Sequence, residues 1–290
     1  MQDADWLAER FEGARGHLRA VAYRMLGSVP DAEDAVQEAW LRLSRSDAGE
    51  IENLTGWLTT VVARISLNML QSRVARHEAP VGGHVPDPII TLADPRDPEQ
   101  QAVLADSVGL ALLVVMESLA PAERLAFVLH DMFAFPFEEI APILGKTPAA
   151  ARQLASRARR RVRATAVPDP DRAGQQRVAD AFLAAAREGN FAGLIALLDP
   201  EVVLRVDGGT LREGATRVVH GAHAVAAGAM RFASMAPFAL QVFVNGAPGF
   251  LGRDPGGRIV SVLGMTIRAG KIVELHALTD AARLAKLELP

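Results

Sequence analysis

Residues 137–163 read FEEIAPILGKTPAAARQLASRARRRVR, and this stretch decides the fold prediction for the middle of the chain. Phe137–Leu144 has the apolar spacing of a short helix, and Gly145–Thr147 supplies a turn. Thr147 is suited to cap the following helix, and Pro148 suits its first position, where a missing N–H costs nothing. The stretch therefore predicts two helices joined by a tight glycine turn, which is a helix-turn-helix.

The second of these helices carries a concentrated positive charge. Seven basic residues and no acidic residue lie between Ala141 and Val167. In a helix-turn-helix the second helix reads base edges from its first turns, while basic residues farther along hold phosphates. We therefore predict that Arg152 and Gln153 read base edges and that Arg157, Arg159, Arg160 and Arg163 hold phosphates, with Thr147 and Ser156 in the same DNA-contacting surface. The alternative is a solvated basic face on a structural helix, which a charge run alone would favour.

The composition of the whole chain fits a multidomain globular protein. Its 290 residues include no cysteine, which excludes disulfides, cysteine nucleophiles and thiolate metal sites. The net charge is −3, and four acidic residues fall within 31–38. No apolar run is long enough to span a bilayer, and the acidic, amphipathic N-terminal stretch does not resemble a signal peptide. We expect a cytoplasmic protein with no membrane partner, no cofactor and no metal site.

Three amphipathic helices are predicted before residue 79, and two of them have polar faces of interest. The second helix, after Pro30, exposes an acidic face that is either simply solvated or a docking surface for a basic helical partner. The third, from about Leu54 to His77, carries Arg, Asn and Gln, which are the side chains able to bind bases through two hydrogen bonds. A surface polar face explains these residues equally well.

The remainder of the chain divides at proline-rich stretches. Residues 79–98 hold five prolines and a Gly-Gly pair, which predicts a linker, and Pro168–Pro170 marks a second boundary. The last third predicts an α+β domain with a curved antiparallel sheet. Its expected helices are 172–188 and 191–198, and its expected strands are 201–207, 238–244, 258–268 and 271–278.

Several motifs in a fixed order resemble a known family. YRMLG at 23–27, DAEDAVQEAWLRL at 31–43 and GWL at 56–58 followed by Asn68 resemble region 2 of bacterial sigma factors. LAPAER at 119–124 and the helix-turn-helix resemble region 4. The two-region form resembles the extracytoplasmic-function group. The resemblance implies two all-α domains and the divisions 1–78 (region 2), 79–104 (linker), 105–167 (region 4) and 171–290 (a further domain).

The resemblance also implies roles for single residues. The clamp helices of RNA polymerase core enzyme would bind Asp31, Glu33, Asp34, Gln37, Glu38 and Leu41. The melted −10 strand of promoter DNA would be held by the third helix, through Arg64, Asn68, Gln71, Arg73 and Arg76. The −35 major groove would receive the start of the arginine-bearing helix. A flipped base in a pocket is the expected mode at the −10 element, because unpaired bases expose all their edges.

The last domain resembles the cone-shaped SnoaL-like and nuclear-transport-factor-like fold, and sigma factors with such a fused domain form a subgroup. The motifs similar to that subgroup comprise Asp207, Gly208, Gly209, Asn245, Gly246, Pro248 and Gly249. We expect this domain to regulate activity by docking on the DNA-binding domains and the linker. Such folds often enclose a pocket, so a small-molecule ligand is a candidate partner. The candidate pocket residues are Arg205, Asp207, His220 and His276.

Three functions remain open at this point. The main expectation is a sigma factor that directs RNA polymerase to specific promoters and initiates transcription, with no catalytic residues of its own. The second is a cyclase- or isomerase-like enzyme fused to a DNA-binding module, with Asp207 and His276 as an acid–base pair in a water-shielded cavity. The third is a repressor that binds duplex DNA alone, which leaves the acidic second helix unexplained.

Overall fold

The computed structural model describes residues 2–46, 51–76, 83–92, 108–163, 168–209 and 214–287. These form two compact units, one made of 1–79 with 115–164 and the other of 80–114 with 165–290. Residues 79–82 and 93–104 of the expected linker lie outside the described residues. No helix in the described ranges is long and apolar enough to cross a membrane.

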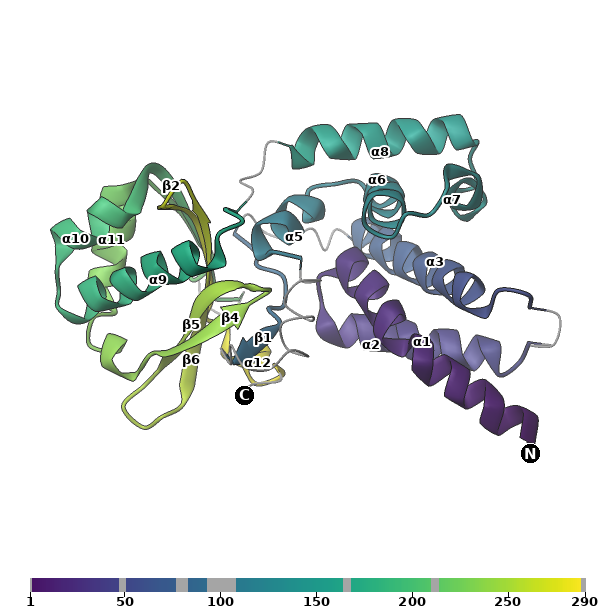
Figure 1. Cartoon of the computed structure of the whole chain (residues 1–290), viewed down its shortest axis with the longest axis horizontal. Helices are drawn as coiled ribbons and strands as arrows, with labels where there is room; N and C mark the ends of the chain where they lie inside the picture. The colour runs from purple at the N-terminus through teal and green to yellow at the C-terminus, as the bar shows by residue number, and fades with distance from the viewer. Residues whose placement is uncertain are drawn as a thin grey trace. The chain divides into compact units, whose positions relative to one another are not determined.

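The first unit is helical, as expected (Figure 1). Gly27, with φ of 69°, ends the first helix, and the Ser28 side chain caps the second through the amide of Asp31. Leu18, Met25 and Leu58 are fully buried where the first three helices pack. The helices are α1 (Gln2–Leu26), α2 (Val29–Leu43), α3 (Leu54–Ala75), α6 (Pro121–Phe127), α7 (Phe137–Leu144) and α8 (Pro148–Val162), with α5 (Leu110–Glu117) across the division and a π-helical turn η2 (Val128–Met132) after α6.

The 119–124 motif stabilises this unit. Arg124 is buried, and its Nε donates a hydrogen bond of 3.2 Å to the carbonyl of Arg24 in α1. Burial lowers the pKa of Arg124 to about 10. Its neighbour Glu123 forms an ion pair with Arg161 of α8, in which Oε2 lies 3.3 Å from Nη1. The motif therefore ties α6 both to α1 and to α8.

The second unit is built on one curved sheet with the strand order β1-β4-β5-β6-β7-β2-β3. The expected α+β cone is confirmed, with one correction: the sheet is mixed, because β2 pairs in parallel with β7. The chain between these two strands includes a helix and four strands, which is long enough to return in the same direction. The strands are β1 (Ile90–Leu92), β2 (Leu198–Asp207), β3 (Arg217–His220), β4 (Leu240–Val244), β5 (Ala247–Arg253), β6 (Ile259–Arg268) and β7 (Lys271–Leu278).

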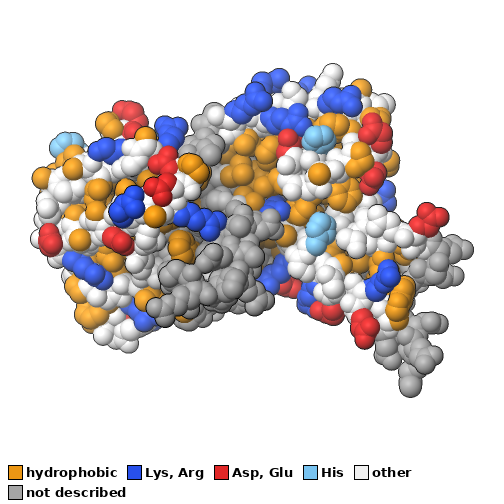
Figure 2. Space-filling view, viewed as in Figure 1, with side chains coloured by type: hydrophobic (Ala, Val, Ile, Leu, Met, Phe, Trp, Pro, Cys, Tyr) orange, Lys and Arg blue, Asp and Glu red, His pale blue; other side chains and the backbone are white. Residues whose placement is uncertain are grey.

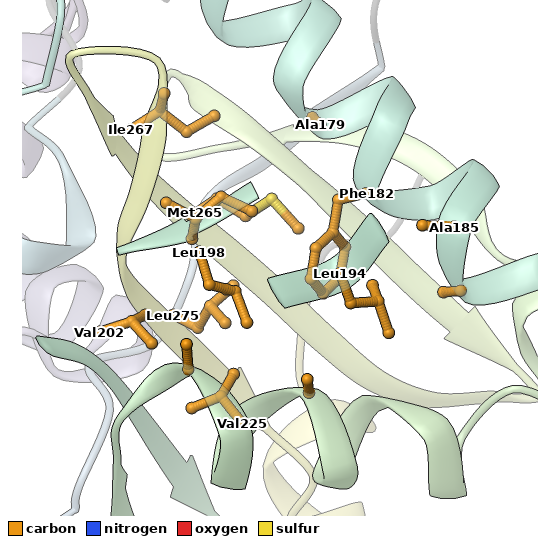
Figure 3. Packing of buried hydrophobic residues seen from close by; sticks show 14 of the residues in the cluster. Ala179, Phe182, Ala185, Leu194, Leu198, Val202, Val225, Met265, Ile267 and Leu275 are labelled. Carbon is orange, nitrogen blue, oxygen red and sulfur yellow. The ribbon is translucent and has the colours of Figure 1, made fainter. Parts of the chain in front are cut away.

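Each face of this sheet has its own core. Helices α9 (Arg172–Arg187), α10 (Phe191–Leu197) and α11 (Ala222–Arg231) cover one face, where Phe182, Leu194, Val225 and Leu275 gather (Figure 3). On the opposite side a smaller cluster joins Val85 and Leu110 to strand residues and to the last short helix, α12 (Ala281–Leu284). Side chains alternate across a strand, so neighbouring residues of β2 and β7 serve opposite faces.

Candidate functional site

The helix-turn-helix is formed by α7 and α8, as the sequence predicts. Gly145 ends α7 in the left-handed conformation (φ 61°, ψ 39°), which glycine adopts without steric cost. The Thr147 side chain accepts a 3.3 Å hydrogen bond from the amide of Ala150, and Pro148 is the first residue of α8. Three alanines at spacings of four and three residues form the buried face of α8 and allow close packing on α6 and α7: Ala151, Ala155 and Ala158.

The opposite side of α8 carries the residues predicted to contact DNA. Thr147, Arg152, Gln153, Arg157 and Arg160 are exposed, and Ser156 is half-buried. The guanidinium of Arg152 lies 5.1 Å from the ring centroid of Phe137, a cation–π contact that orients it near the start of the helix. Figure 2 shows Lys and Arg side chains gathered over α8. The structure therefore brings this predicted set together on one surface.

Arg159, which the sequence predicts to hold phosphate, is instead engaged within the unit, as is Arg161. The Nε of Arg159 donates a 2.7 Å hydrogen bond to Oδ1 of Asp131, and its Nη2 lies 3.2 Å from Nδ1 of His130. Arg161 pairs with Glu123 and donates 3.2 Å to the carbonyl of Ser118. Arg161 is itself exposed, so ion pairing and not exposure separates the arginines of α8: Arg159 and Arg161 are anchored by carboxylates, whereas Arg152, Arg157 and Arg160 are exposed with no ion pair among the described residues.

The acidic face predicted to bind polymerase lies along α2. Asp34, Gln37 and Leu41 are exposed, and Leu41 retains 41% of its surface. Glu33 is held by Arg15 at 3.4 Å and Arg19 at 3.0 Å, both from α1. Glu38 pairs with Arg42 at 3.0 Å. Between α1 and α2 a surface groove of about 430 Å³ is lined in part by Phe11, Val36, Gln37 and Trp40.

The residues predicted to hold the melted strand lie along α3 and at its C-terminal end. Arg64, Asn68, Gln71 and Arg76 are exposed. Arg73 instead forms an ion pair with Asp31 of α2, and its Nη1 lies 3.5 Å from the carbonyl of Leu26. One predicted DNA-binding residue therefore contacts one predicted polymerase-binding residue, and the pair ties α3 to α2.

The C-terminal motifs hold the segment 83–92. Asp207 is buried, and one of its carboxylate oxygens accepts 2.9 Å bonds from the amide of Val85 and from Nδ1 of His84. Its other oxygen accepts 3.0 Å from the amide of Gly209. Burial acts to raise the pKa of Asp207, but these hydrogen bonds outweigh it and keep the pKa well below its usual range. Asp207 is therefore a charged hydrogen-bond centre.

Arg283 of α12 completes this centre. Its Nη1 lies 2.6 Å from Asp207, its Nε lies 3.0 Å from Asp87, and its Nη2 donates 2.6 Å to the carbonyl of Val85. A Cβ on Gly209 would lie 1.8 Å from a carboxylate oxygen of Asp280, the residue that caps α12. A side chain at Gly209 would therefore displace the Asp280 side chain that caps α12.

The second motif, at Asn245 and Gly246, holds the other end of the 83–92 segment by hydrogen bonds. The Oδ1 of Asn245 accepts a 3.0 Å hydrogen bond from the amide of Ile89. The carbonyl of Ile89 in turn accepts a 2.8 Å hydrogen bond from the backbone amide of Asn245. The Nδ2 of Asn245 donates 3.1 Å to the carbonyl of Val108. Asn245 and Gly246 both have positive φ, 50° and 77°, as a type I′ turn between β4 and β5 requires. Beyond it, β1 pairs antiparallel with β4.

The partners of these motifs were not among the predicted site residues. His84, Val85, Asp87 and Ile89 lie in the expected linker, and Arg283 lies near the chain's end. More than one hundred residues separate Asp207 from Val85, with no periodicity linking them. Of these features, only the Asn245-Gly246 turn could be recognised from the sequence.

The candidate pocket residues do not line the cavity found in the second unit. A cavity of about 170 Å³ lies on the helix-covered face of the sheet, and its lining includes Leu204, Val206, Leu275 and Ala277. Since strand residues alternate, the set Arg205, Asp207 and His276 belongs to the other face. His220 is exposed on β3 and does not line the cavity either. The acid–base pair required by the enzyme alternative is therefore absent from the described lining, which holds neither a carboxylate nor a histidine.

Comparison with known proteins assigns the chain to a family. The model of sigma-70 region 2 matches residues 11–76, and that of sigma-70 region 4 matches 109–162. A probable ECF RNA polymerase sigma factor of Mycobacterium tuberculosis, SigI, is 34% identical over 298 residues, covering 99% of this chain and 98% of SigI. The chain belongs to the extracytoplasmic-function (ECF) sigma factors.

A second relative extends this similarity to three dimensions. The ECF sigma factor SigJ of M. tuberculosis is 45% identical over 220 residues, or 74% of this chain and 69% of SigJ. The crystal structure of SigJ matches with a TM-score of 0.79 at 35% identity, covering 98% of this chain and all of that one. The helical regions and the C-terminal sheet domain are thus both shared with a known ECF sigma factor.

Proposed function

We propose that this ECF sigma factor binds bacterial RNA polymerase core enzyme in the cytoplasm, directs it to specific promoters and initiates transcription. The carrying observation is the capped helix α8, whose arginines divide into the anchored pair Arg159 and Arg161 and an exposed group, Arg152, Arg157 and Arg160, that has no ion pair among the described residues. A structural helix would need only the anchored pair. The exposed group supports a surface selected for an external partner, and its charge and position suit a duplex major groove.

In this proposal, Arg152 and Gln153 read base edges of the −35 element, with Thr147 and Ser156 beside them. Arg157 and Arg160 hold phosphates. The exposed polar face of α3, with Arg64, Asn68, Gln71 and Arg76, takes the melted −10 strand. Arg73 contributes there only after release from Asp31, because the two now form an ion pair.

The clamp helices of the polymerase contact α2. Asp34, Gln37 and Leu41 support this assignment by their exposure, and the neighbouring groove beside Trp40 adds apolar surface to an acidic face. Glu33, Glu38 and Asp31 have intramolecular arginine partners. We therefore assign them a weaker part in polymerase binding, through exchange of these partners.

The C-terminal domain modulates activity by holding the segment that connects the two DNA-reading regions. We take regions 2 and 4 as 1–78 and 105–167, the connection as 79–104, and the regulatory domain as 171–290. The hydrogen bonds from Asp207 and Asn245 to Val85 and Ile89 support this proposal. A segment fixed in a sheet has less reach than a free one of equal length, so release would change the spacing that the two regions can span. A small-molecule ligand of this domain is a further part of the proposal.

The test is reconstitution with purified core polymerase. The full chain should co-purify with core, and the mixture should initiate at defined sites on a random-sequence promoter library, mapped by sequencing the transcripts' 5′ ends. Asp34→Arg, which reverses charge on the proposed contact face, should weaken core binding at least tenfold. Glu188→Arg is the matched control, since Glu188 is exposed on the second unit. If the chain fails to bind core, or if both variants bind alike, the proposal is wrong.

A further inference from the structure

The cavity of the second unit is built almost entirely from apolar groups. Helix α9 contributes Phe182 and Leu183, helix α11 contributes Val225, and the strands contribute Leu263 and Leu275 among others. Phe182, Val225 and Leu275 also belong to the buried cluster drawn in Figure 3, so the inner wall of the cavity is the domain's own core. The inner wall is therefore firmly packed, and the cavity has a defined shape.

The size of the cavity exceeds an ordinary packing defect. Its volume of about 170 Å³ compares with the roughly 150 Å³ of an apolar cavity that stays dry and admits a benzene ring. Taking about 30 Å³ for each water-sized group, it accommodates around six methylene groups. Hydroxyls of Ser261 and Thr279 are the uncharged polar side chains among its described lining. An apolar guest therefore gains more from this space than water does.

The charged lining residues all have one sign. Arg217 of β3 and Arg231 at the end of α11 both line the cavity, and both are exposed, as is Phe232. These residues mark the open side. Neither arginine has an ion-pair partner among the described residues, whereas Arg283 of the same domain is paired with two carboxylates. No described lining residue is acidic. The mouth is therefore positive while the interior is apolar.

We propose that this cavity binds a small amphipathic carboxylate of the medium-chain acyl type, with the chain among the apolar side chains and the carboxylate at Arg217 and Arg231. Guanidinium groups bind carboxylates through paired charge-assisted hydrogen bonds, which fixes the orientation of such a ligand. The inference rests on the proposed regulatory role of the C-terminal domain and names the chemistry of its ligand. The same domain holds the 83–92 segment, so the ligand would act on promoter spacing from the opposite face of one sheet.

Octanoate is the probe, measured against the purified full chain by ligand-observed NMR and calorimetry without polymerase. We expect saturable binding to one site, with octanol and octyltrimethylammonium at least tenfold weaker. The variant Arg217→Gln/Arg231→Gln should bind octanoate at least tenfold more weakly while its octanol binding is unchanged. Arg172→Gln/Arg268→Gln, which removes two exposed arginines outside the cavity, is the charge-matched control and should bind as the unmodified chain does.

A second variant fills the cavity. Gly228 lines it within α11, and a Cβ there would meet only Nη2 of Arg231, at 3.9 Å. Gly228→Leu should therefore fold and abolish octanoate binding, while Gly16→Leu, at a helical glycine of α1 with nothing within 4 Å, should not. No octanoate binding to the unmodified chain, equal binding of octanol, or binding retained in Gly228→Leu would each overturn the proposal. Because these assays contain no polymerase, their failure leaves the sigma-factor proposal to its own test.

Discussion

Helix α8 and the C-terminal motifs differ in how their functional residues are held. In α8 the proposed DNA-reading residues are exposed, and the helix that presents them is defined by its own cap and alanine face. Asp207 and Asn245 are buried, and their side chains bond to residues more than one hundred positions away. In our proposal the first kind of site acts on a partner outside the chain. The second acts on the chain itself, by holding a connecting segment.

The largest expected effect is loss of the buried carboxylate. Asp207→Ala leaves the amide of Val85 without its acceptor and removes one of the two carboxylates paired with Arg283. Removing one member of a buried ion pair typically costs about 3–5 kcal/mol. For a unit of this size that cost corresponds to a fall in melting temperature of roughly 6–20 °C, at about 2–4 °C per kcal/mol.

Differential scanning calorimetry checks this difference between the two kinds of site. Arg157→Ala on α8 serves as the comparison and should leave the melting temperature unchanged within about 1 °C, as surface substitutions usually do. Equal melting temperatures for Asp207→Ala and the unmodified chain would show that the buried network does not stabilise the second unit.

The second effect depends on pH. Burial, and the nearby charge of Arg205, lower the pKa of His276 to about 3. The unfolded chain therefore binds this proton first, near pH 6.5, and stability falls as the pH drops below that value, by up to about 1.4 kcal/mol per pH unit. His276→Leu removes the titrating group and should flatten this dependence.

Chemical denaturation of both proteins between pH 7 and pH 5 measures the slope. Neither ring nitrogen of His276 has a hydrogen-bond partner within the part of the chain described, so the variant should lose little stability at pH 7. Parallel slopes for the two proteins would show that His276 is accessible to protons in the folded state.

An intermediate effect is expected for base reading. Arg152→Ala should weaken binding to the selected −35 sequence about fivefold to 150-fold, since a good bidentate base contact contributes about 1–3 kcal/mol. Binding to unrelated DNA should change far less. Fluorescence anisotropy of holoenzyme on matched and mismatched duplexes measures both. An equal loss on all sequences would reassign Arg152 to phosphate binding.

The smallest effect separates neighbouring arginines within α8. Arg160→Gln should reduce the salt dependence of DNA binding by about one unit of log–log slope, because each phosphate contact releases counterions. Arg159→Gln breaks the bond to Asp131 and should instead lower stability, by up to about 1 kcal/mol. Salt titrations and thermal melts of both variants distinguish these roles. A loss of stability in Arg160→Gln and a reduced salt dependence in Arg159→Gln would contradict these assigned roles.

The helix-turn-helix could be predicted from sequence because its determinants are local. A glycine turn, a threonine cap and proline at the first helical position lie within four residues, and each fixes the backbone nearby. The exposure of Arg157 and Arg160 followed from helical periodicity. The Asn245-Gly246 turn was equally readable, since few dipeptides adopt two successive positive φ values.

The remaining features depend on pairings that the sequence does not encode locally. The parallel alignment of β2 with β7 joins strands separated by more than sixty residues. The ion pair of Arg73 with Asp31 and the bonds of Asp207 to the 83–92 segment arise only after folding. The pocket assignment was wrong for a related reason: which alternate residues of a strand face the helices is set by the packing of the whole domain.

The central claim is that the C-terminal motifs hold the connecting segment, and hydrogen exchange of the full chain tests it most directly. The amides of Val85 and Ile89 donate to Asp207 and Asn245, so both should exchange slowly in the unmodified protein and in Arg157→Ala. In Asp207→Ala the exchange at Val85 should become at least tenfold faster. Rapid exchange of both amides in the unmodified protein, or unchanged exchange at Val85 in Asp207→Ala, would contradict the claim.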